Sequence, residues 1–203
     1  MKLENSKINK VGIIGSGTMG SQIAALFANY GVSVLLLDVE TEKDGVYTSE
    51  IAEKAIKRLK EIKPSPIINE SVLGLIETGN TKEHMKMSNE VDWVIEAVSE
   101  NIKIKKDVWQ NISKYVDART ILTTNTSGIL ISSIKSSLPR HLTSRFMGTH
   151  FFNPPRYLKL LEIIPTETTD SEVIDLVTMF AESVLEKGVV ICKDVPNFIG
   201  NRL

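Results

Sequence analysis

The stretch VGIIGSGTMGSQIAALFANYG (11–31) decides the fold class of this 203-residue chain. A short apolar run comes first, then three glycines spaced as G-x-G-x-x-G, then a longer run whose apolar residues have helical spacing. A strand that turns through such glycines into a helix forms the phosphate-binding part of a dinucleotide site. The sequence therefore predicts a βαβ unit that binds a dinucleotide cofactor.

Each glycine of this turn has its own task. Gly15 permits the tight turn, Gly17 has no side chain to keep the backbone from the pyrophosphate, and Gly20 lets the helix pack closely on the strand. Free N–H groups at the helix N-terminus then face the phosphates. The predicted cofactor-binding residues of the turn are Gly15, Ser16, Gly17, Thr18, Met19 and Gly20.

Asp38 ends the second predicted strand, VSVLLLD (32–38). A carboxylate at this place accepts hydrogen bonds from the adenosine ribose and repels a 2′-phosphate. No arginine follows it in VETEKD (39–44), so NAD is favoured over NADP. The alternative interpretation is that Asp38 is only a turn residue after a strand.

Short apolar runs alternate with helical stretches along the whole chain, which is typical of a parallel sheet covered on both faces. We expect an α/β fold of the Rossmann type, with a doubly wound and mostly parallel sheet. The expected strands are 11–15, 32–38, 92–98, 120–125 and 145–151, and two later runs at 158–165 and 188–194 extend the sheet.

About fifty residues separate the second and third of these strands, more than one crossover helix needs. SEIAEKAIKRLKEIK (49–63) has a helical apolar face, Pro64 and Pro66 interrupt it, and INESVLGLIETGN (68–80) follows. We expect a helical hairpin over about 42–80 that projects from the sheet. Whether it serves a function or is merely a solvated helix pair stays open.

The last ten residues, DVPNFIGNRL (194–203), indicate a new helix that begins at Pro196 and has no capping signal. We expect residues 1–194 to form the cofactor domain. Residues 195–203 are then the start of a helical C-terminal domain that is absent from this sequence.

Composition disfavours several classes of partner. No apolar run approaches the ~18–20 residues that span a bilayer, and the start MKLENSKINK (1–10) is polar, so we expect no membrane role and a cytoplasmic location. The chain has 24 Lys and Arg against 25 Asp and Glu, interspersed, so no basic stripe indicates nucleic-acid binding.

Cysteine and histidine are too sparse to predict a metal site. The single cysteine, Cys192, lies in the apolar run VVICK (189–193), where a buried strand residue is favoured over a nucleophile. His84, His141 and His150 lack the spacing of a zinc site, and the first two have the polar surroundings of surface residues.

His150 and Glu162 form the candidate catalytic pair. His150 lies between the strand RFMGT (145–149) and the turn FFNPP (151–155), and Glu162 lies among aliphatic residues in LKLLEIIP (158–165). A carboxylate in so apolar a strand needs a partner. An imidazole held by a carboxylate suits alcohol oxidation, because it can take the hydroxyl proton. The alternative is a histidine that is satisfied in the core.

Taken together, these segments resemble the 3-hydroxyacyl-CoA dehydrogenase family, and in particular its 3-hydroxybutyryl-CoA dehydrogenases. The resemblance covers the chain from Ile8 to the end. Its motifs are IGSGTMGSQIA (14–24), EAVSENIKIKKDVW (96–109), TTNTSGILISSI (123–134), GTHFFNPPRYLKLLEIIP (148–165) and CKDVPNFIGNRL (192–203).

The resemblance implies an oxidoreductase that uses NAD to convert a (3S)-3-hydroxyacyl-CoA to the 3-oxoacyl-CoA, in fatty acid β-oxidation or butanoate metabolism. His150 would be the general base and Glu162 its partner. Ser127 would lie near the reacting hydroxyl and the nicotinamide, and Asn201 would form a hydrogen bond with the reacting oxygen. The alternative for Ser127 is a turn or cap residue.

The same resemblance implies that Glu100 and Lys105 contact the cofactor, with a solvated helix face as the alternative. The hairpin would cover the CoA tail, but the serine and lysine that contact CoA in the family do not align cleanly with residues of this hairpin. Lys57, Lys60 and Lys63 are only compositional candidates for CoA phosphates.

Two departures from the family bear on function. Asn197 replaces the family's glycine between the proline and phenylalanine of the last motif, which affects the turn before Asn201. The family's helical second domain, which closes the cleft and forms the dimer in the family, is expected to be absent from this sequence, and a homo-oligomer is expected where that domain is present. Two alternatives stay open: an NAD-binding module without independent catalysis, and a related dehydrogenase that acts on a hydroxy acid without CoA.

Overall fold

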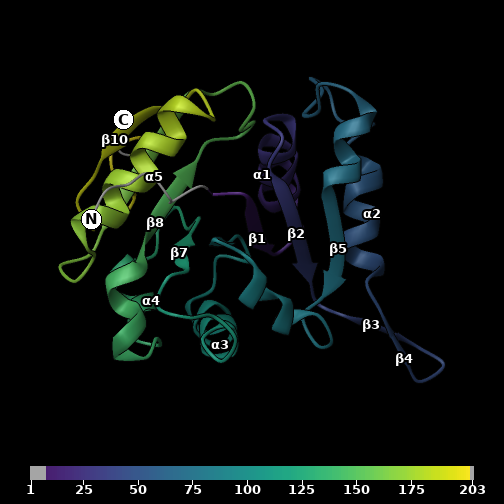
Figure 1. The fold of residues 1–203 in the computed structure, drawn as a ribbon, viewed down its shortest axis with the longest axis horizontal. Helices are drawn as coiled ribbons and strands as arrows, with labels where there is room; N and C mark the ends of the chain where they lie inside the picture. Colours follow the sequence, from purple (N-terminus) through teal and green to yellow (C-terminus); the bar gives the residue numbers. More distant parts are fainter. Residues whose placement is uncertain (1–7, 202–203) are drawn as a thin grey trace.

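An eight-stranded sheet lies at the centre of the computed structural model, which describes residues 8–201 (Figure 1). The strands lie in the order β10-β9-β8-β7-β6-β1-β2-β5. Their bounds are β1 Lys10–Ile14, β2 Ser33–Asp38, β5 Ile76–Asn80, β6 Trp93–Glu96, β7 Ile121–Thr124, β8 Phe146–Phe151, β9 Leu160–Pro165 and β10 Gly188–Ile191. The helices are α1 Thr18–Asn29, α2 Glu50–Arg58, α3 Ile102–Ile112, α4 Ile131–Lys135 and α5 Ser171–Ser183, with 3₁₀ helices at Glu70–Leu75, Met85–Glu90 and Arg140–Arg145.

The sheet is parallel between all neighbouring strands except β8 and β9. β1 lies in the middle, with Gly12 opposite Leu35 of β2 on one side and Val94 of β6 on the other. The doubly wound, mostly parallel sheet is therefore confirmed, and each expected strand is found within a few residues of its predicted place. The carboxyl ends of β1, β2, β6, β7 and β8 meet along one edge of the sheet.

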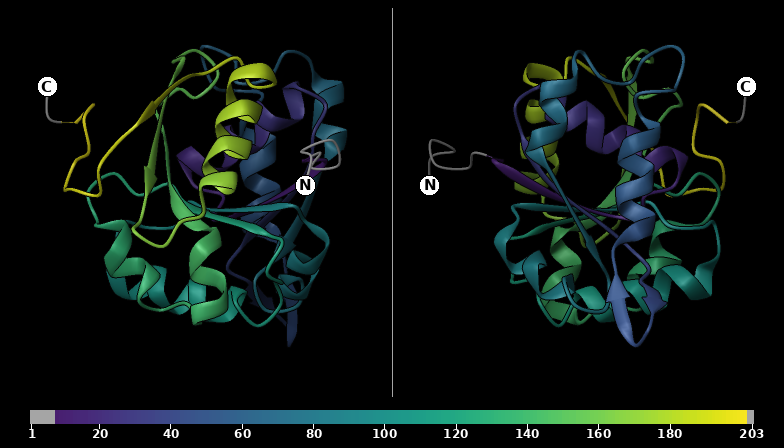
Figure 2. Two further views of the ribbon diagram at one scale, coloured as in Figure 1. Left: turned by 60° about the vertical axis from the view of Figure 1, so that its left-hand side comes forward. Right: turned by 90° about the vertical axis from the view of Figure 1, so that its right-hand side faces the viewer.

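Helices cover both faces of the sheet, and each face has its own core. α1 and α5 lie on one side, and α3 and α4 lie on the other (Figure 2). Phe27 of α1 and Phe180 of α5 pack on the first face, whereas Trp109 of α3 contacts Phe146 on the second. Burial of apolar residues on both faces explains why the central strands are continuous apolar runs.

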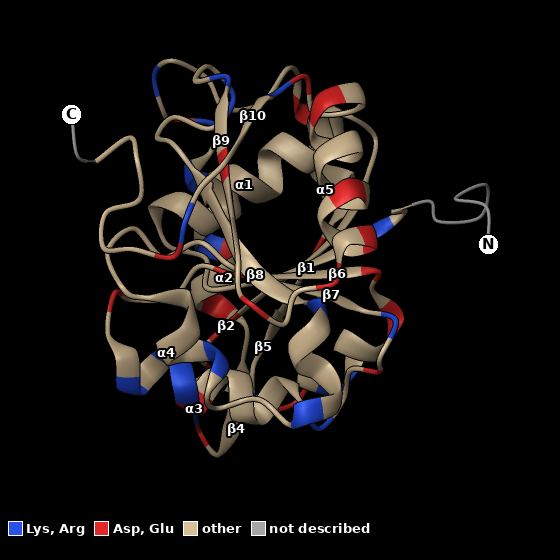
Figure 3. Cartoon of the chain, turned by 90° about the vertical axis from the view of Figure 1, so that its left-hand side faces the viewer, with Lys and Arg blue, Asp and Glu red and all other residues tan. Residues whose placement is uncertain are grey.

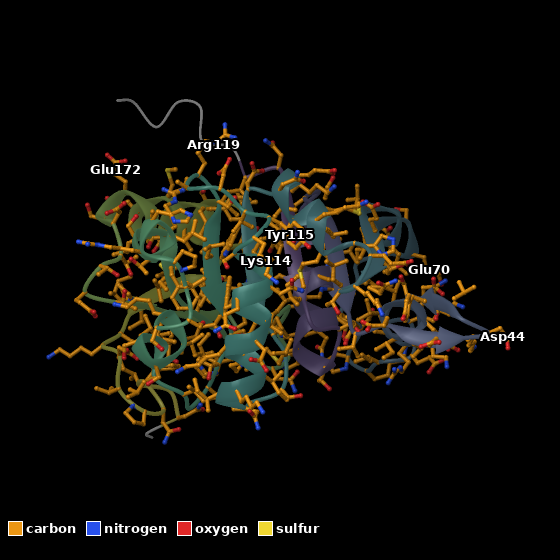
Figure 4. All side chains as sticks on the ribbon, turned by 90° about the horizontal axis from the view of Figure 1, so that it is seen from below. Asp44, Glu70, Lys114, Tyr115, Arg119 and Glu172 are labelled. Atoms are coloured by element: carbon orange, nitrogen blue, oxygen red, sulfur yellow. The ribbon has the colours of Figure 1, made fainter. Side chains whose placement is uncertain are left out.

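The helical hairpin expected over 42–80 is wrong in two places. Residues 41–48 form a two-stranded antiparallel hairpin, β3 (Thr41–Lys43) and β4 (Val46–Thr48), which projects from the body with Asp44 at its tip (Figures 1 and 4). The expected first helix is present as α2, but the expected second helix is a 3₁₀ turn followed by β5.

β5 replaces the second helix because it completes the edge of the sheet beside β2. Its register runs from Ile76 opposite Val34 to Asn80 opposite Asp38. Gly79 allows the close approach, since an added Cβ there would lie 2.6 Å from the Leu37 side chain. A glycine has low helix propensity, and pairing with β2 satisfies the backbone of this segment instead.

The helix expected to begin at Pro196 is also wrong over the described residues. Residues 196–201 form turns, and Asn197 and Phe198 have φ angles of 65° and 45° in the left-handed region. A right-handed helix cannot pass through two such residues. Asparagine tolerates this region better than most residues, which fits Asn197 at the position where the family has glycine. Residues 202 and 203 lie outside the described part.

Charge and helix length add two observations. Acidic residues lie on α5, while lysines lie on α3 and α4, so residues of both signs appear in the same view of the molecule (Figure 3). None of the helices found between residues 8 and 201 has both the length and the apolar character needed to cross a bilayer.

Candidate active site

The glycine turn between β1 and α1 has the geometry that a phosphate site needs. Gly15 has a φ of 100°, and its N–H donates to the carbonyl of Leu37 at 2.7 Å. A Cβ on Gly20 would lie 1.8 Å from the carbonyl oxygen of Gly15, so the helix can pack here only with glycine. A Cβ on Gly17, in contrast, would meet nothing within 4 Å, so this residue faces open space.

Asp38 lies beside this turn, and Ser16 holds its carboxylate. Oδ2 of Asp38 accepts hydrogen bonds from the backbone N–H of Ser16 at 2.5 Å and from its hydroxyl at 2.6 Å. Gly17, Thr18 and Asp38 line a cavity of about 290 Å³ between the turn and α2. An open glycine, free N–H groups at a helix N-terminus and a carboxylate at the strand end fit the pyrophosphate and ribose of a dinucleotide. Met19 packs against the core and does not line this cavity.

Glu100 organises the loop that carries Ser127. One oxygen, Oε1, accepts from the hydroxyl of Thr126 at 2.5 Å and from the N–H groups of Ser127 and Gly128, both at 2.9 Å. Burial raises the pKa of the Glu100 carboxyl, but these donors and the nearby Lys105 outweigh it, so the pKa lies below its ordinary value. Glu100 is therefore an anion that shapes this loop.

Lys105 is buried behind Glu100. Its ammonium lies 2.7 Å from Oε1 of Glu96, 3.2 Å from the carbonyl of Val98 and 3.4 Å from Oε2 of Glu100, and its side chain is 1% exposed. The direct contact with the cofactor that we expected for Lys105 stays a prediction, and the ammonium offers almost no free surface for it. In the structure, Lys105 holds the carboxylates of Glu96 and Glu100 together at the end of β6.

Sequence reasoning missed Glu96. Its other oxygen, Oε2, accepts from the hydroxyl of Thr124 on β7 at 2.7 Å, so Glu96 joins two strand ends to Lys105. A carboxylate inside the apolar strand WVIE (93–96) is the same signal that singled out Glu162, and it could have found this residue.

His150 and Glu162 lie opposite each other on the antiparallel strands β8 and β9. Nδ1 of His150 is 2.7 Å from Oε2 of Glu162, and Nε2 is 3.1 Å from the hydroxyl oxygen of Ser127. His150 is 5% exposed, and its imidazole lies against the rings of Phe152 and Phe198. The predicted pairing of His150 with Glu162 is confirmed as a contact, while its catalytic role stays a prediction.

The chain after β10 is bound to the same carboxylate. Oε1 of Glu162 accepts the N–H groups of Ile199 at 2.9 Å and Gly200 at 2.8 Å. Asn201 follows in an exposed turn, and its side chain has no hydrogen-bond partner among residues 8–201. Its predicted contact with a reacting oxygen is untested. Cys192 is buried beside Oε1 at 3.5 Å, and burial next to this carboxylate raises the pKa of its thiol to about 11, as expected for a structural cysteine.

Two further residues position the site, and neither was predicted. Asp194 accepts the N–H groups of Ile131 at 2.7 Å and Ser132 at 2.8 Å, so it joins the first turn of α4 to the segment after β10. Lys187 is buried and donates to the carbonyls of Pro155 and Leu158 in the β8–β9 connection. Their partners lie far away in the sequence, so no local pattern indicates them.

The chain is similar to known proteins over most of its length. The family described as 3-hydroxyacyl-CoA dehydrogenase, NAD binding domain, matches residues 10–195. The chain belongs to this family. NAD is accordingly the cofactor of the domain, and the resemblance seen in the sequence is confirmed.

Individual members show the same relationship. A probable 3-hydroxyacyl-CoA dehydrogenase of Bacillus subtilis (strain 168) is 41% identical over 97% of this chain and 26% of its own length. The mitochondrial hydroxyacyl-coenzyme A dehydrogenase of Homo sapiens is 35% identical over 97% of this chain and 62% of its own length. The crystal structure of (S)-3-hydroxybutyryl-CoA dehydrogenase from Ralstonia eutropha has a TM-score of 0.80 and 28% identity, covering 97% of this chain and 68% of that chain. The chain thus spans less than two thirds of the length of either sequence relative.

Proposed function

We propose that this chain supplies the cofactor and proton-transfer machinery for NAD-dependent oxidation of a (3S)-3-hydroxyacyl-CoA to the 3-oxoacyl-CoA. The observation that carries the proposal is the chain of contacts from Glu162 through His150 to Ser127, at the edge of the sheet where the glycine turn also lies. A buried imidazole between a carboxylate and a hydroxyl is suited to general base catalysis.

In this proposal His150 takes the proton of the substrate hydroxyl at Nε2. Glu162 holds Nδ1, orients the ring and stabilises the imidazolium that forms. Ser127 lies where it can bond the same hydroxyl, and Glu100 keeps the Ser127 loop in place. Bound NAD supplies the hydride acceptor. The rings of Phe152 and Phe198 exclude water from one side of the imidazole.

The test is NADH oxidation with acetoacetyl-CoA, followed by the absorbance of NADH. His150→Ala should lower the turnover of the purified chain by about 10²-fold or more, because a positioned general base contributes that much. His141→Ala, an exposed histidine on the surface, is the matched control and should leave turnover unchanged.

Binding of NADH by each variant, measured separately, distinguishes loss of chemistry from loss of the cofactor. Turnover by His150→Ala at the wild-type rate would refute the assignment. A wild-type chain that binds NADH without turnover would support the alternative, an NAD-binding module that needs a further domain.

A second substrate class has support from one comparison. The structure of a diketoreductase superposes with a TM-score of 0.82 at 26% identity, and that protein is described as acting on dicarbonyl compounds. The same fold therefore serves a protein whose described substrates are not named as CoA thioesters. Offering acetoacetate beside acetoacetyl-CoA separates the two candidates, because only an enzyme for free acids reduces the former at a comparable rate.

We also propose the substrate, the domain extent, the location and the oligomeric state of the protein. An acyl-CoA is the substrate partner, residues 1–194 form the cofactor domain, the location is cytoplasmic, and the protein forms a homo-oligomer where a helical C-terminal domain is present. Analytical sedimentation of the chain, with and without that domain attached, measures the oligomeric state.

A further inference from the structure

The cavity beside the glycine turn has a second wall, which α2 provides. Ile51, Ala55 and Arg58 of this helix line the same cavity as Gly17 and Asp38. α2 is held against α1, since Ala52 belongs to the core cluster around α1 and Leu59 packs with Ala25 (Figure 1). The cavity therefore lies between two packed elements, and Gly17, Thr18 and Arg58 are exposed where it opens to solvent.

Arg58 is the only cationic side chain among the residues that line this cavity. Its Nε has a long contact of 3.4 Å to the carbonyl of Lys54, and no carboxylate within residues 8–201 forms an ion pair with it. Two neighbouring lysines differ in this respect. Lys54 pairs with Glu50 at 2.7 Å, and Lys60 pairs with Glu70 at 2.6 Å.

We propose that Arg58 binds the pyrophosphate of the dinucleotide from α2, opposite the backbone N–H groups of the glycine turn. The turn itself, from Gly15 to Gly20, contains no basic side chain, so helix α1 offers only partial charges to the phosphates. An unpaired guanidinium that lines the same cavity adds a full charge and a planar fork of donors that matches phosphate oxygens. This inference rests on the NAD site of the proposed function.

The same cavity discriminates between NAD and other adenine nucleotides. NADPH and CoA carry a further phosphate on the adenosine ribose, and NAD does not. The carboxylate of Asp38 repels such a phosphate, while Arg58 attracts the pyrophosphate that all three share. α2 thus contributes charge to cofactor binding, whereas the lysines of this segment were expected only as candidates for the phosphates of CoA.

Titration of NADH by its fluorescence tests the proposal on the chain as it is. Arg58→Ala should raise the Kd for NADH and for ADP-ribose by about tenfold, the loss of one charge-assisted contact, and leave the Kd for adenosine unchanged. Arg58→Lys should recover part of the affinity. Lys54→Ala removes an exposed charge from the same helix that does not line the cavity and should bind NADH as the wild type does. Equal urea midpoints of all variants show that each is folded.

Four outcomes would overturn the proposal. Arg58→Ala could bind NADH as tightly as Lys54→Ala does. It could lose affinity for NADPH or CoA alone, which would place Arg58 at the ribose phosphate or in the substrate site. It could lose affinity for adenosine to the same extent, which would mean that the substitution distorts the whole cavity. A wild-type chain that binds no NADH would overturn the cofactor site as a whole, and this result is distinct from the other three.

Discussion

Glu162 is nearly inaccessible to solvent and yet is an anion. Burial raises the pKa of its carboxyl, but the hydrogen bond from His150 and the backbone N–H groups of Gly200 and Ile199 outweigh burial, so the pKa lies below the ordinary value of 4.5. Its two oxygens have different partners, because Oε2 faces the imidazole and Oε1 faces the chain after β10. One side chain therefore connects the predicted base to the segment that carries Asn201.

Protonation of Glu162 should weaken the fold in acid. A carboxyl whose pKa is lower in the folded than in the unfolded chain contributes stability above its unfolded pKa, and that contribution disappears as the pH falls through the folded pKa. In urea titrations, the free energy of unfolding of wild type should exceed that of Glu162→Gln at pH 7, and the difference should shrink below a pH of about 4.5. Glu61→Gln, at an exposed site, is the control. A difference independent of pH would contradict this prediction.

At the scale of elements, the turn from β1 into α1 uses its glycines for two separate purposes. Gly20 brings the helix against the backbone of Gly15, which is a packing task. Gly17 faces open space, which leaves room for a ligand. Because the two positions lie three residues apart in one motif, they allow stability and cofactor binding to be changed independently.

Gly17→Ala should keep the stability of the chain and lose NADH affinity, because the new methyl group meets no protein atom but lies where the phosphates approach. Gly20→Ala should lower the free energy of unfolding by about 1–3 kcal/mol or more, since its Cβ overlaps backbone that cannot yield cheaply. Gly74→Ala, with open space around it, is the control. Urea midpoints and NADH titrations measure both effects, and equal behaviour of the two variants would refute the distinction.

At the scale of the whole molecule, Phe27 connects the layers on one face of the sheet. Its ring lies 5.4 Å from that of Trp93 on β6, 6.4 Å from that of Phe151 on β8 and 6.0 Å from that of Phe180 on α5. These contacts link α1, the centre of the sheet and α5. The half that carries the glycine turn is thereby joined to the half that carries His150.

Phe27→Ala should destabilise the entire chain by about 3–5 kcal/mol, because it removes a buried ring and leaves a cavity between three elements. The loss should appear as a single cooperative shift of the thermal transition rather than as local melting. Tyr115→Ala, at a ring that is 39% exposed (Figure 4), should change the transition much less. A loss at Phe27 no larger than that at Tyr115 would contradict the prediction.

The sequence by itself determined the features that depend on residues near one another along the chain. The glycine turn, Asp38, the central strands and the two-faced burial of the sheet are local patterns of glycine spacing and hydrophobic periodicity. The motif HFFNPP (150–155) and the apolar strand around Glu162 made His150 a candidate partner for Glu162 on one condition, that the turn bring the second strand back beside the first. The antiparallel register of β8 and β9 meets that condition.

Tertiary structure alone decided the rest, because the competing partners are distant in sequence. β5 is a strand since the edge of β2 needs a partner, although its sequence lies within the segment INESVLGLIETGN (68–80) that was expected to be a helix. The turns after Pro196 exist because Glu162 takes the N–H groups that a helix would use internally. Likewise, the burial of Lys105 against Glu96 and the place of Arg58 across from the glycine turn depend on how α3 and α2 pack on the sheet, which no local pattern records.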